Sequence, residues 1–126
     1  MTRDGIVGMF ISSPSKKAEF DILQADKRLN AGLYLFLRGD KKYDLALSTI
    51  SKGQNYYDDA IGKLIRAKEE GEGPVDTIRK LNQSLKNQNE ILKKLEKNFG
   101  KDVGKKLDSV QKRTESLQIR SNKLSS

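Results

Sequence analysis

The sequence of 126 residues contains no cysteine and no histidine. Without cysteine, the chain has no disulfide bond, zinc–thiolate site or thiol nucleophile. Without histidine, it lacks the commonest general base of enzymes and the commonest ligand of transition metals. We therefore expect a non-enzymatic protein with no catalytic residues, no metal site and no cofactor. The absence of cysteine fixes no compartment, because both the cytosol and an exported domain allow it.

Long apolar runs are missing as well. The longest, at residues 31–37 and including a glycine, is far shorter than the ~20 residues that span a bilayer. A short apolar patch at residues 6–11 lacks the length and the cleavage site of a signal peptide. We expect a soluble chain in which residues 1–12 form a lead-in to the folded part.

Charged residues are abundant and apolar residues are few. Apolar residues make up 35% and charged residues 33% of the chain, against typical values of about 45–50% and 25%. The length suits one domain with a core of its own. Regular hydrophobic periodicity argues against disorder, so the composition indicates elongated amphipathic helices.

The first predicted helix spans residues 14–38. Ser13 and Pro14 open it, with a hydroxyl at the N-cap and proline at the first helical position. Gly39 provides a stop, and Asp40 is expected to cap the next helix, so this short turn predicts antiparallel neighbours. The apolar stripe of the first helix has steps of four and three and consists of Ala18, Ile22, Ala25, Leu29, Gly32 and Phe36.

The second predicted helix spans residues 40–70 and ends before the Gly- and Pro-containing run at residues 71–74. Gly32 and Gly53 fall on the packing side, where glycine predicts a close approach of the two helices. The stripe of the second helix consists of Tyr43, Leu47, Ile50, Gln54, Tyr57, Ile61 and Leu64.

Residues 75–124 have helical character throughout, with one irregularity: two successive steps of four at Phe99, Val103 and Leu107. One interpretation is a stutter in a single helix of about 50 residues, which would project from the bundle and require a partner or an oligomer. The other, favoured by Gly100 and Gly104, is a break between helices at residues 75–98 and 102–124. The stripe consists of Ile78, Leu81, Leu85, Gln88, Leu92, Leu95, Phe99, Val103, Leu107, Val110, Thr114, Leu117, Ser121 and Leu124.

These patterns predict an all-α fold, an antiparallel up-down bundle of three to four long helices with coiled-coil-like spacing. Gln88 interrupts its apolar stripe and is interpreted as a polar position that sets the register of packing. Tyr43 and Tyr57 lie on a stripe and are expected to pack in the core. The paired acids Asp58 and Asp59 point about 100° apart on a helix, so we expect a solvated surface there.

Positive charge is concentrated in the C-terminal part. Residues 1–73 carry a net charge of +1, and residues 74–126 carry +7. Such a cluster is suited to nucleic acid, acidic envelope polymers or anionic lipid headgroups, or is simply the solvated face of a lysine-rich helix. The candidate anion- or partner-binding face consists of Lys93, Lys94, Lys97, Lys101, Lys105, Lys106, Lys112 and Arg113.

Sequence-specific nucleic-acid binding is less favoured by this region. Phe99 is its only aromatic residue and belongs to the apolar stripe, so no base-stacking platform accompanies the lysines. Ten lysines accompany only three arginines after residue 73, whereas base-edge recognition favours arginine.

Several motifs resemble an uncharacterised family of bacterial helical domains. They are SPSKKAEF at residues 13–20, ADKRL at 25–29, YDLA at 43–46, AKEEG at 67–71 and NEILKKLE at 89–96. The resemblance covers roughly residues 3–120 and implies an extracytoplasmic domain that follows a single N-terminal membrane span. The resemblance implies no particular activity. Many members have proline where this chain has residues 100–104, which favours a helix break.

Two functional hypotheses follow. The first is a non-enzymatic interaction or structural module, the soluble part of a membrane-tethered bacterial envelope protein that contacts another protein or an anionic envelope component. The second is a cytoplasmic helical protein that binds nucleic acid or another polyanion through its basic C-terminal region.

Overall fold

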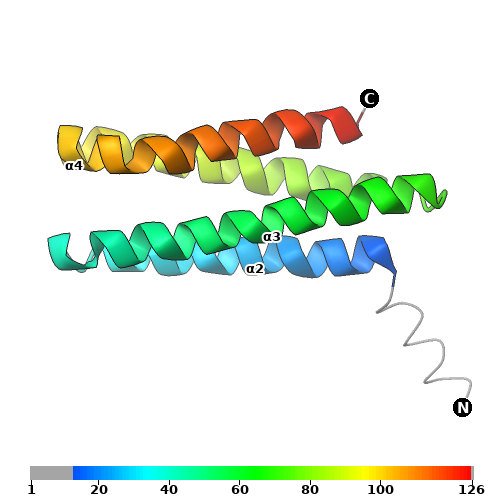
Figure 1. Ribbon diagram of the computed structural model, residues 1–126, viewed down its shortest axis with the longest axis horizontal. Helices are drawn as coiled ribbons and strands as arrows, with labels where there is room; N and C mark the ends of the chain where they lie inside the picture. Colours follow the sequence, from blue (N-terminus) through cyan, green and yellow to red (C-terminus); the bar gives the residue numbers. More distant parts are fainter. Residues whose placement is uncertain (1–12, 126) are drawn as a thin grey trace, which may run out of the picture.

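Figure 1 shows the computed structural model, which describes residues 13–125 except for the side chains of residues 40 and 100–102. The chain is an all-α antiparallel bundle, as its periodicity predicts. Helix α2 spans Pro14–Phe36, η1 is a 3-10 turn at Asp40–Lys42, α3 spans Tyr43–Glu69 and α4 spans Val75–Leu124. The expected lead-in at residues 1–12 lies outside the described residues.

The expected stripes form the core. Every stripe residue of α2 is buried, and the stripe residues of α3 and α4 are buried apart from Tyr43, Leu47 and Phe99, which are half-buried. The spacing predicts this burial because residues three and four apart share one face of a helix. Tyr57 is fully buried, as expected.

The two helix starts differ from their predicted capping. Ser13 is the N-cap residue of α2, but its hydroxyl makes no cap hydrogen bond and instead donates to the Glu72 carboxylate at 2.7 Å. The expected cap Asp40 begins η1, and Lys42 is the N-cap residue of α3, which starts three residues later than predicted. Gly39 ends the α2 region in a left-handed conformation at φ 114°, as its position predicts.

Glycine brings α2 and α3 into close contact at two levels. A Cβ atom on Gly32 would lie 2.5 Å from Cγ1 of Ile50, and one on Gly53 would lie 2.9 Å from Cβ of Arg28. Both distances are too short for real side chains, so the predicted close approach is confirmed. Gly62 faces open space, and the approach of the helices does not depend on it.

Helix α4 folds back on itself (Figure 1). Helical residues run without interruption from Val75 to Leu124, yet the Asn82 amide donates to the Ser125 hydroxyl at 3.2 Å. In a straight helix these residues would be about 65 Å apart. The chain direction therefore reverses between Phe99 and Val103, where the stripe takes its two steps of four.

The two arms of α4, residues 75–99 and 103–124, pack side by side along the α2–α3 pair. The second arm buries Leu107, Val110 and Leu117 against the bundle. The second arm packs on the bundle and does not project from it, so the prediction of a single projecting helix is wrong. This fold-back is the packing predicted by a break between residues 75–98 and 102–124, although the helical residues of α4 run on without a gap.

A polar layer divides the core. Buried Gln54, Gln88 and Thr114 come from α3 and the two arms of α4. The Gln54 amide donates to the Val110 carbonyl and to the Thr114 hydroxyl, both at 2.7 Å, and the Thr114 hydroxyl donates to the Gln88 oxygen at 3.0 Å. Apolar clusters lie on both sides of this layer. Gln88, interpreted from sequence as a register-setting residue, belongs to it.

Candidate functional site

The candidate basic residues fall into groups with different surroundings. Lys106 and Arg113 face α3: the Lys106 amine lies 3.6 Å from the Asp44 carboxylate, and the Arg113 guanidinium lies 2.8 Å from the Asp58 carboxylate. Arg120, seven residues beyond Arg113, also pairs with Asp58. A spacing of seven repeats one helix face, so this row of cations fastens the second arm of α4 to α3.

Asp58 is the centre of this contact. Partial burial raises its pKa, but hydrogen bonds and charge from Arg113 and Arg120 outweigh burial, so the net pKa lies below the usual value. Its neighbour Asp59 is exposed, so the two carboxylates do not share a site. Asp59 is solvated, as expected, whereas Asp58 forms ion pairs with two arginines.

Lys112 pairs within its own helix. Its amine lies 3.0 Å from the Asp108 carboxylate, and both side chains are largely exposed. An exposed pair of this kind contributes little to stability and leaves the lysine open to other anions.

The remaining candidates gather where α4 reverses. Lys93, Lys94, Lys97 and Lys105 are exposed, and the described residues provide none of them with an ion pair. Each lies within seven residues of residue 100, which corresponds to about 10 Å of helix. The side chain of the eighth candidate, Lys101, lies outside the described part.

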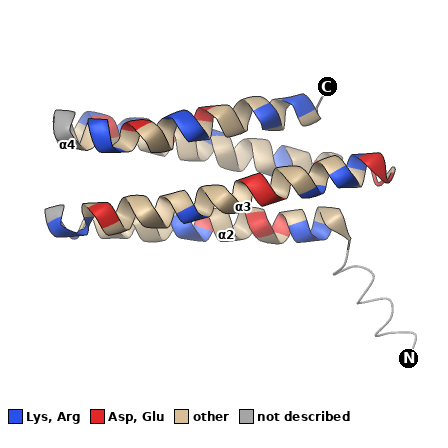
Figure 2. Ribbon diagram, in the orientation of Figure 1, with Lys and Arg blue, Asp and Glu red and all other residues tan. Residues whose placement is uncertain are grey.

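The α2–α3 connection brings further cations to the same end of the bundle (Figure 2). Phe36 and Tyr43 flank this connection and pack against Phe99 at the reversal, with ring centroids 6.1 and 6.0 Å from that ring. We call this end the cationic tip. Its described cations are Arg38, Lys41, Lys42, Lys93, Lys94, Lys97 and Lys105, all exposed.

By sequence, the two segments of the cationic tip carry most of the net charge. Residues 38–44 contain three cations and two acids, and residues 93–106 contain six cations and two acids, a net of +5 out of +8 for the chain. Sequence reasoning missed the contribution of residues 38–42. The antiparallel order of the helices was the available signal, since it places the first turn and the reversal at the same end.

Apolar and aromatic side chains are exposed among these cations. Leu37 is 78% exposed and Tyr34 is 59% exposed. Arg38 donates to the Tyr34 hydroxyl at 2.7 Å, and its guanidinium carbon lies 5.4 Å from the centre of the Tyr34 ring. The C-terminal end of α2 and the two residues after it thus combine an ordered Arg–Tyr pair with an uncovered leucine.

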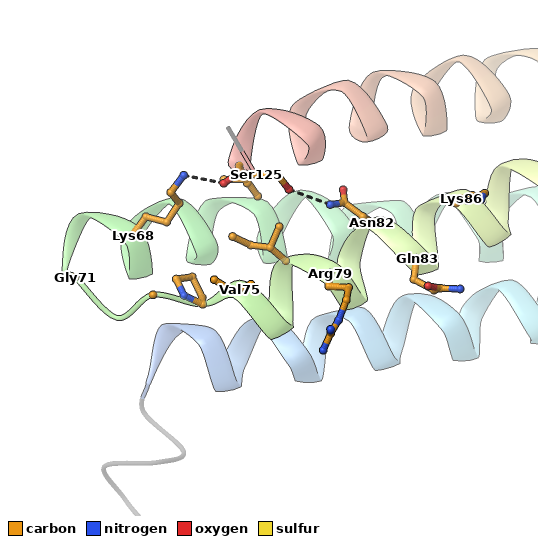
Figure 3. A pocket seen from close by; sticks show the side chains of 12 residues that line it. Lys68, Gly71, Val75, Arg79, Asn82, Gln83, Lys86 and Ser125 are labelled. Carbon is orange, nitrogen blue, oxygen red and sulfur yellow. Dashed lines mark hydrogen bonds between the residues drawn. The ribbon is translucent and has the colours of Figure 1, made fainter.

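The opposite end contains a cavity of about 770 Å³ between the α3–α4 loop and the end of α4 (Figure 3). Lys68, Arg79 and Lys86 contribute positive charge to its lining. The Lys68 amine donates to the Leu124 carbonyl at 2.7 Å, and Arg79 pairs with Asp76. Two of the three cations are therefore engaged within the fold, in contrast to Lys93, Lys94, Lys97 and Lys105, which have no ion pair to a described residue.

The buried hydroxyl groups also have structural partners. The hydroxyls of Tyr57 and Ser84 are 2.5 Å apart, and Ser84 donates to Asp26. Burial raises the pKa of Tyr57 well above its usual value, partly offset by the bond to Ser84. This arrangement holds α2, α3 and α4 together and keeps the tyrosine neutral.

The described part of the chain, residues 13–125, has neither a cluster of metal ligands nor a membrane-spanning helix. The described side chains include no group of three acidic residues suited to holding a metal ion. None of the described helices combines the length and apolar character needed to cross a bilayer. Comparison with protein-family models, curated proteins and solved structures finds no match for this chain.

Proposed function

We propose that this chain is a non-enzymatic interaction module whose cationic tip binds an anionic component of the bacterial envelope. In this proposal the bundle is the folded, extracytoplasmic part of a membrane-tethered protein. The placement in the envelope rests on the resemblance of its helix motifs to bacterial domains of that kind.

The observation that supports binding is the gathering of uncompensated charge. Two segments separated by about fifty residues in sequence supply the tip, and Lys94, Lys97 and Lys105 are exposed there without an ion pair to a described residue. Concentrated charge of one sign attracts polyanions and speeds their association. By contrast, Lys106 and Arg113 are occupied by acids of α3.

Removing charge from the tip tests this proposal. We expect the triple variant Lys94→Gln, Lys97→Gln, Lys105→Gln to bind a soluble polyanion such as polyphosphate on the order of 100-fold more weakly at low salt, since each cation near an anionic surface contributes about 1 kcal/mol. Fluorescence titration at several salt concentrations measures the affinity, and the dependence on salt should become shallower in the variant.

A matched control has the same net charge. Lys17, Lys27 and Lys52 are exposed lysines elsewhere on α2 and α3, and their replacement by glutamine should weaken binding much less. Equal losses in both triple variants would mean that total charge, rather than the tip, governs binding. That result, or no binding by the unaltered protein, would contradict the proposal.

Nucleic acid is the competing polyanion, and the packing of Phe99 bears on it. Its ring packs against Phe36 and Tyr43, so it is engaged in the aromatic cluster rather than free for base stacking. The protein should bind single-stranded DNA or RNA no more tightly than polyphosphate at equal salt. Much tighter binding to nucleic acid would favour the cytoplasmic nucleic-acid-binding protein over the envelope module.

A further inference from the structure

We infer that the partner of the cationic tip is the surface of an anionic phospholipid bilayer, into which Leu37 inserts. This inference rests on the proposed function, since it specifies which anionic envelope component the tip binds. It adds an apolar contact that a soluble acidic polymer would not provide.

The first argument is the exposure of Leu37. It is the most exposed of the large apolar side chains in the described part of the chain, and it lies at the C-cap of α2. A leucine held in water gains by transfer to an apolar environment. An aqueous polyanion offers no such environment, whereas the region below lipid headgroups does.

The second argument is the Arg38–Tyr34 pair beside this leucine. Tyr34, in the last turn of α2, and Leu37, its C-cap residue, are three residues apart and therefore lie at neighbouring positions. Tyrosine favours the membrane–water interface, and arginine places its charge at the headgroups while its stem contacts apolar groups. The hydrogen bond and the cation–π contact with the ring hold this pair in place before any contact with lipid.

The third argument is charge complementarity around the apolar side chains. Lys41 and Lys42 follow Arg38 at the α2–α3 connection, and the lysines of the α4 reversal lie at the same end. Anionic lipids attract clustered cations within about a Debye length of the surface. The tip therefore combines the two elements of peripheral membrane binding, positive charge and an apolar side chain able to insert.

The absence of tryptophan from the chain provides a clean probe. We expect the emission of Leu37→Trp to shift to shorter wavelength and to be quenched by brominated lipid when vesicles of equal parts phosphatidylcholine and phosphatidylglycerol are added. Val75→Trp is the matched control, because Val75 is 73% exposed at the opposite end of the bundle. Its emission should not change.

Binding strength gives a second readout by vesicle sedimentation. Leu37→Ser should weaken binding to the mixed vesicles roughly tenfold, and Val75→Ser should not. Lys41→Gln and Lys42→Gln should each weaken binding about fivefold, and vesicles of phosphatidylcholine alone should bind little of the protein.

The outcomes separate this inference from the proposed function. Bilayer insertion would be overturned if the protein bound vesicles and polyphosphate with the same dependence on charge, if Leu37→Ser had no effect on binding, and if the emission of Leu37→Trp did not shift. An acidic polymer would then remain as the partner. No binding to either at low salt would overturn both. Equal shifts for the two tryptophan variants would show non-specific adsorption and also contradict insertion.

Discussion

Gly32 and Gly62 are both helical glycines, but their surroundings differ. A Cβ atom at Gly32 would collide with Ile50, whose Cγ1 atom would be 2.5 Å away, and it would lie 3.1 Å from the Ala46 carbonyl oxygen. At Gly62 nothing lies within 4 Å. The same substitution should therefore have opposite effects on stability at the two positions.

We expect Gly32→Ala to lower the free energy of unfolding by about 1–3 kcal/mol, because the helices must separate or Ile50 must leave its rotamer. Gly62→Ala should raise it by about 0.5–1 kcal/mol, because alanine favours the helix and meets no obstacle. Urea unfolding followed by circular dichroism measures both. A stabilising Gly32→Ala would mean that α2 and α3 are not packed as closely as described.

Pairing between α3 and the second arm of α4 is a property of elements, and Asp58 makes it dependent on pH. The folded-state pKa of Asp58 lies below its usual value. Its stabilising contribution is therefore present above the unfolded-state pKa of about 3.9 and is lost as pH falls through the lower, folded-state value.

We expect Asp58→Asn to reduce the free energy of unfolding by about 1 kcal/mol at neutral pH, an amount suited to a partly exposed ion pair with two partners. The difference from the unaltered protein should disappear in acid and shrink in concentrated salt. Asp59→Asn is the control, since Asp59 is exposed beside it, and should change stability by less than about 0.5 kcal/mol. Equal effects of the two variants would contradict this role of Asp58.

Hydrophobic spacing predicted the buried face of each helix, because burial depends mainly on periodicity within one element. It did not determine the path of α4. Steps of four at Phe99, Val103 and Leu107 suit a stutter and a break equally well. The close contact that accompanies the reversal, between Gly104 and Glu96 across the two arms, depends on tertiary packing that spacing cannot express.

The candidate site was only partly predictable for a related reason. Lys97 and Lys105 were identified from the charge of their own segment. Arg38 and Lys42 join them only because the bundle brings the first turn beside the reversal. Whether a lysine faces an acid on another helix, as Lys106 faces Asp44, is likewise a result of topology.

At the scale of the whole molecule, we expect the polar layer of Gln54, Gln88 and Thr114 to set how the α4 arms align with α3. Gln54→Leu should lower the free energy of unfolding by about 1–3 kcal/mol, since it removes the amide that the Thr114 and Val110 oxygens accept from. The triple variant Gln54→Leu, Gln88→Leu, Thr114→Val should recover that stability, because no buried polar side chain of the layer then lacks a partner.

Alignment of the helices should be less well defined in the triple variant, since apolar side chains pack in more than one register. Its amide NMR spectrum is expected to show doubled or broadened signals near the former layer, at recovered stability. Sharp, single signals would show that the apolar contacts alone fix the alignment.

The start of α2 and the end of α4 lie at the same end of the bundle (Figure 1), and this has a mechanical consequence. A force applied between Pro14 and Leu124 would pull the helices apart crosswise at one end, where Ser13 bonds Glu72 and Lys68 bonds the Leu124 carbonyl. A force applied in this direction breaks the contacts between helices one after another, starting at the pulled end. Opening the bundle in this way therefore needs less force than sliding whole helices past one another, which would break many contacts at once. The cationic tip, about 35 Å away along α2, would be the last part to come undone.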